Sequence, residues 1–359
     1  MKNIDKISKI YKNKLVLITG HTGFKGSWLA LFLNLLGARV VGISKSTLYK
    51  NSHYHFIKKV FFKEYFFNLT DKYKLKKIIT RIKPDFIFNL AAQSLVIKSY
   101  KDPYSTFYEN FMITLNILDV IKNLNFKIVA VFITSDKSYK NVNTIKPYKE
   151  NDILGGDDPY SGSKGAIELL INSYFQSFFK NQNKIRIAVA RAGNVIGGGD
   201  WSEDRIIPDT FKFWYKNKKI NIRNPKATRP WQHVMEPLYG YITLAYNLNN
   251  NPKNNGEVFN FGPITNNKSV ENLVKNLNFL WDPKNKLYTS AREKIKFSEA
   301  SLLALNSKKA YQNLGWQCIL SYQETIELIY NWYFEYKKNK KNTLKTSIKQ
   351  IKFYLEKLN

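Results

Sequence analysis

The chain has 359 residues, a length that fits one large domain and a second, smaller domain. Hydrophobic residues make up 44% and aromatic residues 15% of the chain, which excludes a globally disordered protein. Its formal net charge is +30, from 57 basic and 27 acidic residues. The lysines are spread along the chain and are not gathered into one segment, so we interpret the charge as a general bias of the amino-acid composition and not as a binding site for a polyanion. A basic surface would still favour a phosphate-bearing substrate.

Short apolar runs alternate with helical patterns over the first half of the chain. The predicted strands lie at 15–19, 39–43, 85–90, 128–134 and 185–190, and the predicted helices at 28–36, 75–82, 107–124 and 164–179. This alternation is typical of a parallel sheet covered by helices on both faces. The sequence therefore predicts an α/β fold with a doubly wound, Rossmann-type parallel sheet.

The pattern changes after residue 191, where glycine and proline punctuate the chain and helices dominate beyond residue 262. Residues 258–261 are expected to return to the main sheet. We expect three parts: a Rossmann domain over 1–190 plus about 229–263, a smaller C-terminal substrate-binding lobe over about 191–228 plus 264–335, and a Lys-rich tail over 336–359. The tail is expected to form a loosely attached terminal helix, with partner binding as the alternative.

The sequence carries few signs of metals, membranes or nucleic acids. A single cysteine, Cys318, excludes an internal disulfide and a cysteine-based zinc site, and the four histidines do not suggest a metal site either. The first residues lack the apolar core of a signal peptide, and no apolar run reaches the ~18 residues of a membrane span. We expect a cytoplasmic protein with no metal, membrane or nucleic-acid partner.

A glycine-rich turn lies between the first predicted strand and the first predicted helix. Glycines at positions 20, 23 and 26 let the chain turn sharply, let a pyrophosphate approach bare backbone, and present a helix N-terminus to negative charge. The position of the turn makes it a strong signal for a dinucleotide. The residues predicted to contact the cofactor here are Gly20, Thr22, Gly23, Phe24, Lys25 and Gly26.

The end of the second predicted strand does not identify the cofactor. An acidic residue usually holds the ribose hydroxyls there, but this strand ends in Gly42-Ile43-Ser44-Lys45. Arg39 and Lys45 are near in sequence and could take a 2′-phosphate. These local residues therefore leave NAD and NADP both open.

Tyr160 and Lys164 are four residues apart, so on a helix they share one face. A free tyrosine has a pKa near ~10, too high for a base at neutral pH. A lysine charge and a cofactor's positive ring would stabilise the phenolate, which could then accept a proton from a sugar hydroxyl. The run Asp157-Asp158-Pro159 just before favours a helix start at this point.

A second polar group, Thr134-Ser135-Asp136-Lys137, follows the strand predicted at 128–134. Ligands bind at the carboxyl ends of strands in such sheets. A hydroxyl, a carboxylate and an ammonium there could orient a substrate, donate a proton and steer charge. The alternative is a polar loop with a helix cap; together with Tyr160 and Lys164 we favour a catalytic role.

Seven runs carry a family resemblance: GHTGFKGSWLA (21–30 with its preceding glycine), NLAAQSLV (89–96), TSDKSY (134–139), the 160–164 segment, ARAGNVIGGGDW (190–201), DRIIPD (204–209) and RNPKATRPWQHV (223–234). With these runs the chain resembles the CDP-glucose 4,6-dehydratases, in the extended short-chain dehydrogenase/reductase family of NAD-dependent epimerases and dehydratases. The likeness extends to about residue 330 and leaves the Lys-rich tail outside it. The glycine turn and the Tyr/Lys pair mark the wider family, and the other runs are narrower.

The resemblance implies a hydro-lyase that uses NAD to oxidise carbon 4 of CDP-glucose, eliminates water across carbons 5 and 6, and returns the hydride to carbon 6. It implies that Tyr160 takes the hydroxyl proton, Ser135 binds the carbon-4 oxygen, Asp136 acts as acid toward the carbon-6 hydroxyl, and Lys164 tunes Tyr160 and binds the nicotinamide ribose. The further residues implied to contact the cofactor are Asn68, Leu69, Ala91 and Ala92. Gln93 is expected to reach toward the sugar.

Lys137 departs from the wider dehydratases, where a glutamate at this position is usually named the carbon-5 base. A lysine serves as base only when its pKa is lowered, and it could instead stabilise the enolate-like charge. The lysine is consistent with the CDP-glucose branch. The residues expected to bind the nucleotide in the smaller lobe are Asn194, Arg205, Arg229 and Trp231, since guanidinium groups suit phosphates and an indole suits stacking.

Three alternatives and one further expectation remain. The protein could be another nucleotide-sugar dehydratase, a 4-epimerase or, least favoured, a non-catalytic dinucleotide-binding scaffold; the Asp136-Lys137 pair argues against a simple epimerase. The helices predicted at 107–124 and 164–179 are apolar on more than one side, and relatives pair these helices across a dimer interface. We therefore expect a homodimer or homotetramer. The family resemblance separately implies a role in deoxysugar biosynthesis for surface polysaccharide.

Overall fold

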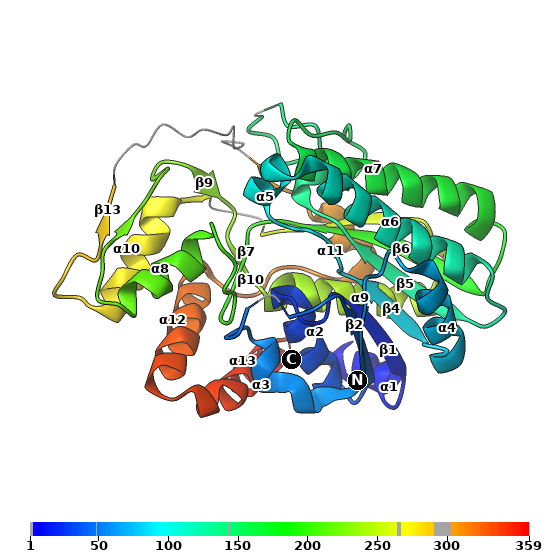
Figure 1. The fold of residues 1–359 in the computed structure, drawn as a ribbon, viewed down its shortest axis with the longest axis horizontal. Helices are drawn as coiled ribbons and strands as arrows, with labels where there is room; N and C mark the ends of the chain where they lie inside the picture. The colour runs from blue at the N-terminus through cyan, green and yellow to red at the C-terminus, as the bar shows by residue number, and fades with distance from the viewer. Residues whose placement is uncertain (1–2, 48, 143, 264–266, 291–302, 359) are drawn as a thin grey trace.

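The structure is a computed structural model that describes residues 3–47, 49–142, 144–263, 267–290 and 303–358, and a seven-stranded parallel sheet lies at its centre (Figure 1). The strand order is β11-β6-β5-β4-β1-β2-β3. The strands are β1 (Leu15–Thr19), β2 (Arg39–Ser44), β3 (Phe61–Phe66), β4 (Phe86–Asn89), β5 (Ile128–Ile133), β6 (Ile185–Ala192) and β11 (Val258–Phe261). This confirms the predicted α/β fold and the return of residues 258–261 to the sheet.

The sheet reverses its order beside β1, because the chain builds β2 and β3 on one side and then crosses to β4, β5 and β6 on the other. In an open parallel sheet, such a reversal leaves a crevice outside the carboxyl ends of the strands, where ligands bind. The turns after β1, β4 and β5 all lie at this edge.

Alternate strand residues face opposite sides of the sheet, as a side-chain period of two requires. Val16 and Ile18 of β1 belong to one hydrophobic core and Leu17 to the other. The first core is covered by α1 (Asn3–Tyr11), α2 (Phe24–Leu35) and α9 (Met235–Asn250), and the second by α4 (Lys72–Ile82), α6 (Pro103–Lys122) and α7 (Pro159–Tyr174). Helices on both faces explain why the central strands are apolar throughout.

The helices of the first half begin earlier than their apolar periodicity predicts. α4, α6 and α7 are capped by Asp71, Asp102 and Asp158, whose side chains accept hydrogen bonds from backbone N–H groups in the first turn. These caps and first turns are polar, so the periodic pattern starts only in the second turn. The edge strand β3 is not predicted from the sequence, because its exposed Phe62 and Phe66 give no clear alternation of apolar and polar residues.

A smaller lobe lies beside the sheet, at the left of Figure 1. Its helices are α8 (Ile206–Trp214), α10 (Val270–Trp281) and α12 (Tyr322–Lys338), and its short strands are β7 (Val195–Ile196), β8 (Ile220–Asn221), β9 (Thr228–Arg229), β10 (Gln232–His233), β12 (Lys268–Ser269) and β13 (Tyr288–Thr289). Aromatic rings fill its interior: Phe211 stacks on Tyr333 with ring centroids 4.0 Å apart. Further helices are α3 (Tyr54–Ile57), α5 (Val96–Lys101) and α11 (Lys308–Leu314).

The Lys-rich end of the chain forms α13 (Thr343–Lys357), and the prediction that it is loosely attached is wrong. Ile351 and Tyr354 are fully buried, and the Ser347 hydroxyl accepts a hydrogen bond from Trp332 Nε1 at 3.0 Å. The lysines occupy only the solvent face of this helix, as at Lys349. Composition hid a regular amphipathic helix whose apolar face belongs to the main core.

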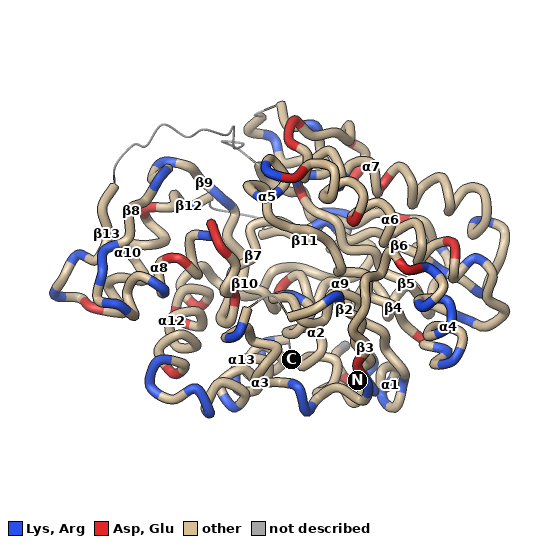
Figure 2. Tube along the Cα trace, viewed as in Figure 1, with Lys and Arg blue, Asp and Glu red and all other residues tan. Residues whose placement is uncertain are grey.

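Charge is distributed over the whole molecule. Figure 2 shows Lys and Arg along the helices of both lobes and no single basic arm. Among the described residues, no helix is long and apolar enough to span a bilayer.

Candidate active site

The glycine-rich turn forms a tight cradle after β1. Gly20 has φ of +73°, and a side chain there would lie 2.9 Å from the backbone of Ala91. A Cβ at Gly26 would lie 2.2 Å from the Gly20 carbonyl oxygen, so helix α2 packs directly on the turn. The N-cap of α2 is Gly23, which has no side chain to occupy the first N–H groups. The helix N-terminus can therefore take the phosphates of a dinucleotide.

Thr22 ties this turn to the end of β2. Its backbone N–H donates to Ser44 Oγ at 3.3 Å, and its hydroxyl donates to the Ser46 carbonyl at 2.8 Å. Phe24 and Lys25 begin α2 and are half-buried.

Arg39, one of two residues left open as partners of a 2′-phosphate, does not lie beside the cradle. It begins β2 opposite Leu15, whereas the cradle follows Thr19 at the other end of β1, roughly 13 Å away at the rise of a strand. Its guanidinium stacks on Phe62, 4.0 Å from the ring centroid. Lys45 is at the correct end, but its amine forms an ion pair with Glu109 at 2.7 Å. Of these two residues, Arg39 is therefore remote from the cradle.

Tyr160 and Lys164 share one face of α7 and are both buried. The Lys164 amine lies 6.0 Å from the centre of the Tyr160 ring. Burial lowers the pKa of Lys164 to about 8, opposed by the charge of Glu168. Burial also raises the pKa of Tyr160 to about 12, although the Ser135 hydroxyl lowers it. Tyr160 is thus protonated at neutral pH in this arrangement, and further positive charge is needed to make it a base.

Ser135 and Asp136 bring a hydroxyl and a carboxylate to the same place, at the carboxyl end of β5. The Ser135 hydroxyl donates to Asp136 Oδ1 at 2.9 Å, and both side chains are buried. Asn194, from the loop after β6, donates to Asp136 Oδ2 at 3.2 Å. Gly193 provides the space, because a Cβ there would lie 1.8 Å from Asp136 Oδ2. Lys137 follows in the same short turn and is half-buried.

A buried ionic network that the sequence analysis missed supports this group from behind. Arg191 of β6 forms an ion pair with Glu168 of α7, and both side chains are almost fully buried. Glu168 also accepts a hydrogen bond from the Thr134 hydroxyl at 2.7 Å, and Arg191 donates to the Tyr139 hydroxyl at 2.6 Å. The network connects the helix that carries Lys164 to the strand ends. Its one local signal was the spacing of Glu168, four residues after Lys164.

The residues of the loop after β4 are used in different ways. Ala91 donates its N–H to Thr19 Oγ1 at 3.2 Å, which holds this loop against the cradle, and Ala92 beside it is half-buried. The Gln93 amide is already engaged with α6 and with its own loop, because it donates to Thr106 Oγ1 of α6 at 3.0 Å and accepts from the Leu95 N–H at 2.6 Å. A contact between Gln93 and a sugar would have to replace these bonds.

Asn68 and Leu69 follow the edge strand β3. Asn68 Oδ1 accepts from the Thr70 N–H at 3.2 Å, and the Leu69 carbonyl accepts from Asn116 of α6 at 3.0 Å. These contacts are to the loop itself and to α6, and a contact of this segment with a cofactor stays a prediction.

The four residues predicted to bind the nucleotide fall into two groups. Asn194 touches Asp136, and Arg205, paired with Asp200 at 3.1 Å, carries a charge that acts on Tyr160. Arg229 and Trp231 lie instead on and after β9, where Trp231 Nε1 donates to the Lys268 carbonyl at 3.0 Å. The first pair therefore lies near Asp136 and Tyr160, and the second pair belongs to the smaller lobe.

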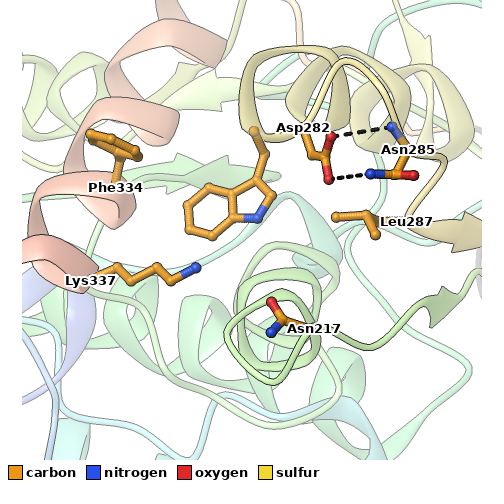
Figure 3. A pocket seen from close by; sticks show the side chains of 7 residues that line it. Asn217, Asp282, Asn285, Leu287, Phe334 and Lys337 are labelled. Carbon is orange, nitrogen blue, oxygen red and sulfur yellow. Dashed lines mark hydrogen bonds between the residues drawn. The ribbon is translucent and has the colours of Figure 1, made fainter.

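A separate hollow of about 440 Å³ lies in the smaller lobe, and none of these residues line it (Figure 3). Its walls are Trp281 and Asp282 at the end of α10 and Phe334 and Lys337 of α12, and Lys337 lies 4.8 Å from the Trp281 ring centre. In the described part of the chain, no group of three or more His, Cys, Asp or Glu side chains could hold a metal ion.

Comparison with known proteins gives consistent matches. A family model described as GDP-mannose 4,6 dehydratase matches residues 17–329. A CDP-glucose 4,6-dehydratase from Salmonella typhimurium is 39% identical over 337 residues, which cover 92% of this chain and 92% of that protein. A dTDP-D-glucose 4,6-dehydratase from Dictyostelium discoideum is 29% identical over 69% of this chain and 58% of its own length.

Solved structures match over nearly the whole chain. An epimerase from Methanothermobacter thermautotrophicus has a TM-score of 0.79 at 23% identity, and the match covers 93% of this chain and 96% of that one. A dTDP-glucose 4,6-dehydratase from Bacillus anthracis, in complex with NAD, has a TM-score of 0.74 at 18% identity, with 91% and 97% covered. At this level of identity the structures establish a shared fold.

Proposed function

We propose, from the premise that this chain belongs to the GDP-mannose 4,6 dehydratase family of nucleotide-sugar enzymes, that it converts CDP-glucose to CDP-4-keto-6-deoxyglucose and water. One structural observation carries the dehydratase assignment. Ser135 and Asp136 lie at the carboxyl ends of the strands beside Tyr160. The Ser135 hydroxyl donates a hydrogen bond to the Asp136 carboxylate, and Ser135 also forms a hydrogen bond with Tyr160. An elimination needs such a second acid beside the Tyr/Lys pair, whereas simple oxidation and reduction at one carbon does not.

The proposed roles follow from the contacts. Tyr160 accepts the proton of the carbon-4 hydroxyl. Ser135, whose hydroxyl forms a hydrogen bond with Tyr160, binds the carbon-4 oxygen. Asp136 gives a proton to the carbon-6 hydroxyl, which leaves as water; Asn194 and Ser135 orient its carboxyl group. Lys164 shares a helix face with Tyr160, and its positive charge stabilises the Tyr160 phenolate. The 4-keto group acidifies carbon 5, and Lys137 is the proposed candidate to take that proton or to stabilise the resulting charge.

The proposed cofactor is NAD, which when bound would supply the hydride acceptor for carbon 4 and the donor for carbon 6. The cradle fits a dinucleotide because close backbone packing at Gly20 and Gly26 leaves the α2 N-terminus bare. In the described part of the chain the buried Lys164 amine forms no hydrogen bond or ion pair and lies 6.0 Å from the centre of the Tyr160 ring, so it is available for a ribose contact. Arg39 lies at the wrong end of β2 for a 2′-phosphate and Lys45 is paired with Glu109, which favours NAD over NADP.

The deciding experiment is carbon-13 NMR of labelled CDP-glucose incubated with the protein and catalytic NAD⁺. We expect carbon 6 to become a methyl group and carbon 4 a ketone or its hydrate, with no net NADH. Steady accumulation of NADH would contradict the dehydratase. Conversion of a uridine, thymidine or guanosine sugar in place of CDP-glucose would keep the chemistry and remove the cytidine assignment. A change of configuration at carbon 4 with carbon 6 intact would favour a 4-epimerase.

We also propose that the protein works as a cytoplasmic homodimer or homotetramer, paired through α6 and α7. Phe107 and Tyr108 of α6 and Leu169 of α7 are all more than 40% exposed on these neighbouring helices. Single exposed apolar residues are ordinary, but a group on two adjacent helices is typical of an interface. A monomeric mass in sedimentation at micromolar concentration would contradict the pairing.

We also propose separate binding roles for the two lobes, which kinetics with CDP-glucose can test. We propose that residues 191–228 and 264–335, together with Arg229 and Trp231 directly after the first of these ranges, hold the CDP part, with Arg205, Arg229 and Trp231 at the diphosphate and the base. Replacing Arg229 or Trp231 with alanine should raise KM for CDP-glucose and leave the affinity for NAD unchanged.

A further inference from the structure

A second hollow, of about 430 Å³, lies at the opposite end of the sheet from the catalytic side chains. It is lined by the first residues of β1 and β2, by the edge strand β3 and by the end of α4. The cradle follows Thr19, whereas this hollow begins at Leu15, so the length of β1, roughly 13 Å at the rise of a strand, separates the two. Among its described lining residues there is none that the cradle or the catalytic group uses.

Four cationic side chains line this basic hollow without carboxylates to balance them. They are Arg39 of β2, Lys63 of β3, and Arg81 and Lys83 at the end of α4. All four residues are exposed, and none forms an ion pair with a described residue. Asp85 is the one acidic residue in the described lining, and its two oxygens accept the Lys14 amine and the Leu15 N–H, each at 2.9 Å. The hollow therefore carries a net positive charge that attracts anions.

The edge strand β3 bulges at this point and turns an aromatic ring outward. Its register against β2 shifts by one residue between Val40 and Val41, which makes Phe62 an extra residue in the strand. The Phe62 side chain is 58% exposed, and the Arg39 guanidinium lies 4.0 Å from the centre of its ring. Bulges are frequent at sheet edges and beside functional sites, where they redirect a side chain. Contact with the ring holds the Arg39 guanidinium in place and leaves its N–H groups able to donate.

A second ring, that of Tyr65, lies beside two more of these cations. Arg81 Nη2 donates to the Tyr65 hydroxyl at 2.8 Å, and the Arg81 guanidinium lies 5.6 Å from the ring centre. The Lys63 amine lies 5.5 Å from the centre of the same ring. The dipole of α4 favours a cation at the end of this helix, which would account for Arg81 by itself. It does not account for Arg39 and Lys63, because both lie on strands.

The composition of the chain does not explain the two guanidinium groups. Arginine accounts for only eight of the 57 basic residues, and two of the eight line this hollow. A general bias toward basic residues supplies lysine in this chain, whereas a planar guanidinium group matches two oxygens of a phosphate at once. Two guanidinium groups beside two lysines therefore suit a ligand with more than one phosphate.

We propose that the basic hollow is a binding site for a diphosphate group, separate from the catalytic site. Arg39 and Arg81 donate to the phosphate oxygens, and Lys63 and Lys83 add positive charge. Free pyrophosphate and a nucleoside diphosphate share this chemistry. A nucleotide would in addition place its base against the exposed Phe62 ring, since bases stack on aromatic side chains.

The first test is protection of arginine side chains from phenylglyoxal, measured for each residue by mass spectrometry. Pyrophosphate should protect Arg39 and Arg81 with one shared midpoint below about 1 mM. At ten times that midpoint, modification should be about tenfold slower, because only the free site reacts. Arg223, which is half exposed in the smaller lobe, is the control in the same sample. Absence of protection, equal protection of Arg223, or equal protection by sodium chloride at the same ionic strength would overturn the proposal.

Variants then test whether the two arginines share one ligand. Arg39→Gln should weaken the protection of Arg81 by pyrophosphate roughly tenfold, because a charged donor to the phosphate is lost. Arg223→Gln should leave that protection unchanged. Both replaced side chains are exposed, so the variants should fold. Protection of Arg81 that is the same in Arg39→Gln and wild type would contradict a shared site.

CDP as the probe distinguishes the two sources of the diphosphate. If CDP protects Arg39 and Arg81 better than pyrophosphate, and Phe62→Ala removes the difference, the ligand is a nucleotide. Equal protection by the two probes identifies free diphosphate as the ligand, and a difference that survives Phe62→Ala refutes the role of the ring. None of these measurements needs turnover. Lack of protection in an active enzyme would therefore remove only this inference, and protection in a protein that converts no nucleotide sugar would remove only the proposed function.

Discussion

A buried carboxyl group, Glu236, makes the stability of this protein depend on pH. Glu236 lies in the first turn of α9 and is 1% exposed. One oxygen accepts the N–H groups of Ile319 and Leu320 at 3.0 and 2.7 Å, and the other accepts the Tyr354 hydroxyl at 2.8 Å. Burial raises the pKa of Glu236 to about 7, although these hydrogen bonds and Lys357 oppose the rise.

The sign of the effect follows from the two protonation states. Between pH 4.5, the ordinary pKa, and about 7, the folded protein holds a proton that the unfolded chain has released. The free energy of unfolding therefore falls as pH rises through this range, and it is level above about 7. The pKa of Glu236 rises from 4.5 in the unfolded chain to about 7 in the folded protein. At about 1.36 kcal/mol for each pKa unit, this rise lowers the free energy of unfolding by about 3 kcal/mol over the pH range.

The test is urea unfolding of wild type and a Glu236→Gln variant at pH 5 and pH 8. Glutamine keeps the size of the side chain and an oxygen for the two N–H groups, and its amide can donate to the Tyr354 hydroxyl. From pH 5 to pH 8 the free energy of unfolding of the wild type should fall by about 2 to 3 kcal/mol relative to that of the variant. The variant escapes this loss because glutamine has no charge to bury. The exposed Glu327→Gln variant on α12 is the control. A difference between Glu236→Gln and wild type that does not change with pH would refute the reasoning.

Three further predictions concern the site and the C-terminal helix. A Tyr160→Phe variant should lower kcat by about 10²–10⁴-fold and leave the affinity for NAD, measured by calorimetry, within a few fold. An Asp136→Asn variant should oxidise CDP-glucose but not eliminate water, so NADH absorbance should persist in a single turnover; immediate decay of that absorbance would contradict the proposed acid. A Tyr354→Ala variant should lose about 3–5 kcal/mol in urea unfolding, since a fully buried ring is removed, and a loss below 1 kcal/mol would contradict the packed position of α13.

The sequence by itself determined the parts of the structure that depend on local patterns. Apolar strands alternating with helices gave the parallel sheet, because both faces of each strand are buried. The spacing of Gly20, Gly23 and Gly26 predicted the cradle, and the spacing of Tyr160 and Lys164 predicted a shared helix face. These features are encoded within a few residues of chain, so neighbouring residue types suffice to recognise them.

Tertiary structure alone decided which distant groups meet. Asn194 reaches Asp136 across 58 residues, and Tyr354 reaches Glu236 across 118, which no local periodicity records. Arg39 is close to the cradle in sequence, but it lies at the first residue of β2, whereas the cradle lies beyond the last residues of β1 and β2. The length of this six-residue strand therefore separates Arg39 from the cradle. The Lys-rich terminal helix showed its charge in its composition, while its apolar stripe acquired meaning only through the core that it covers. Strand direction and long-range packing are properties of the folded chain, and they decided the surroundings of each site residue.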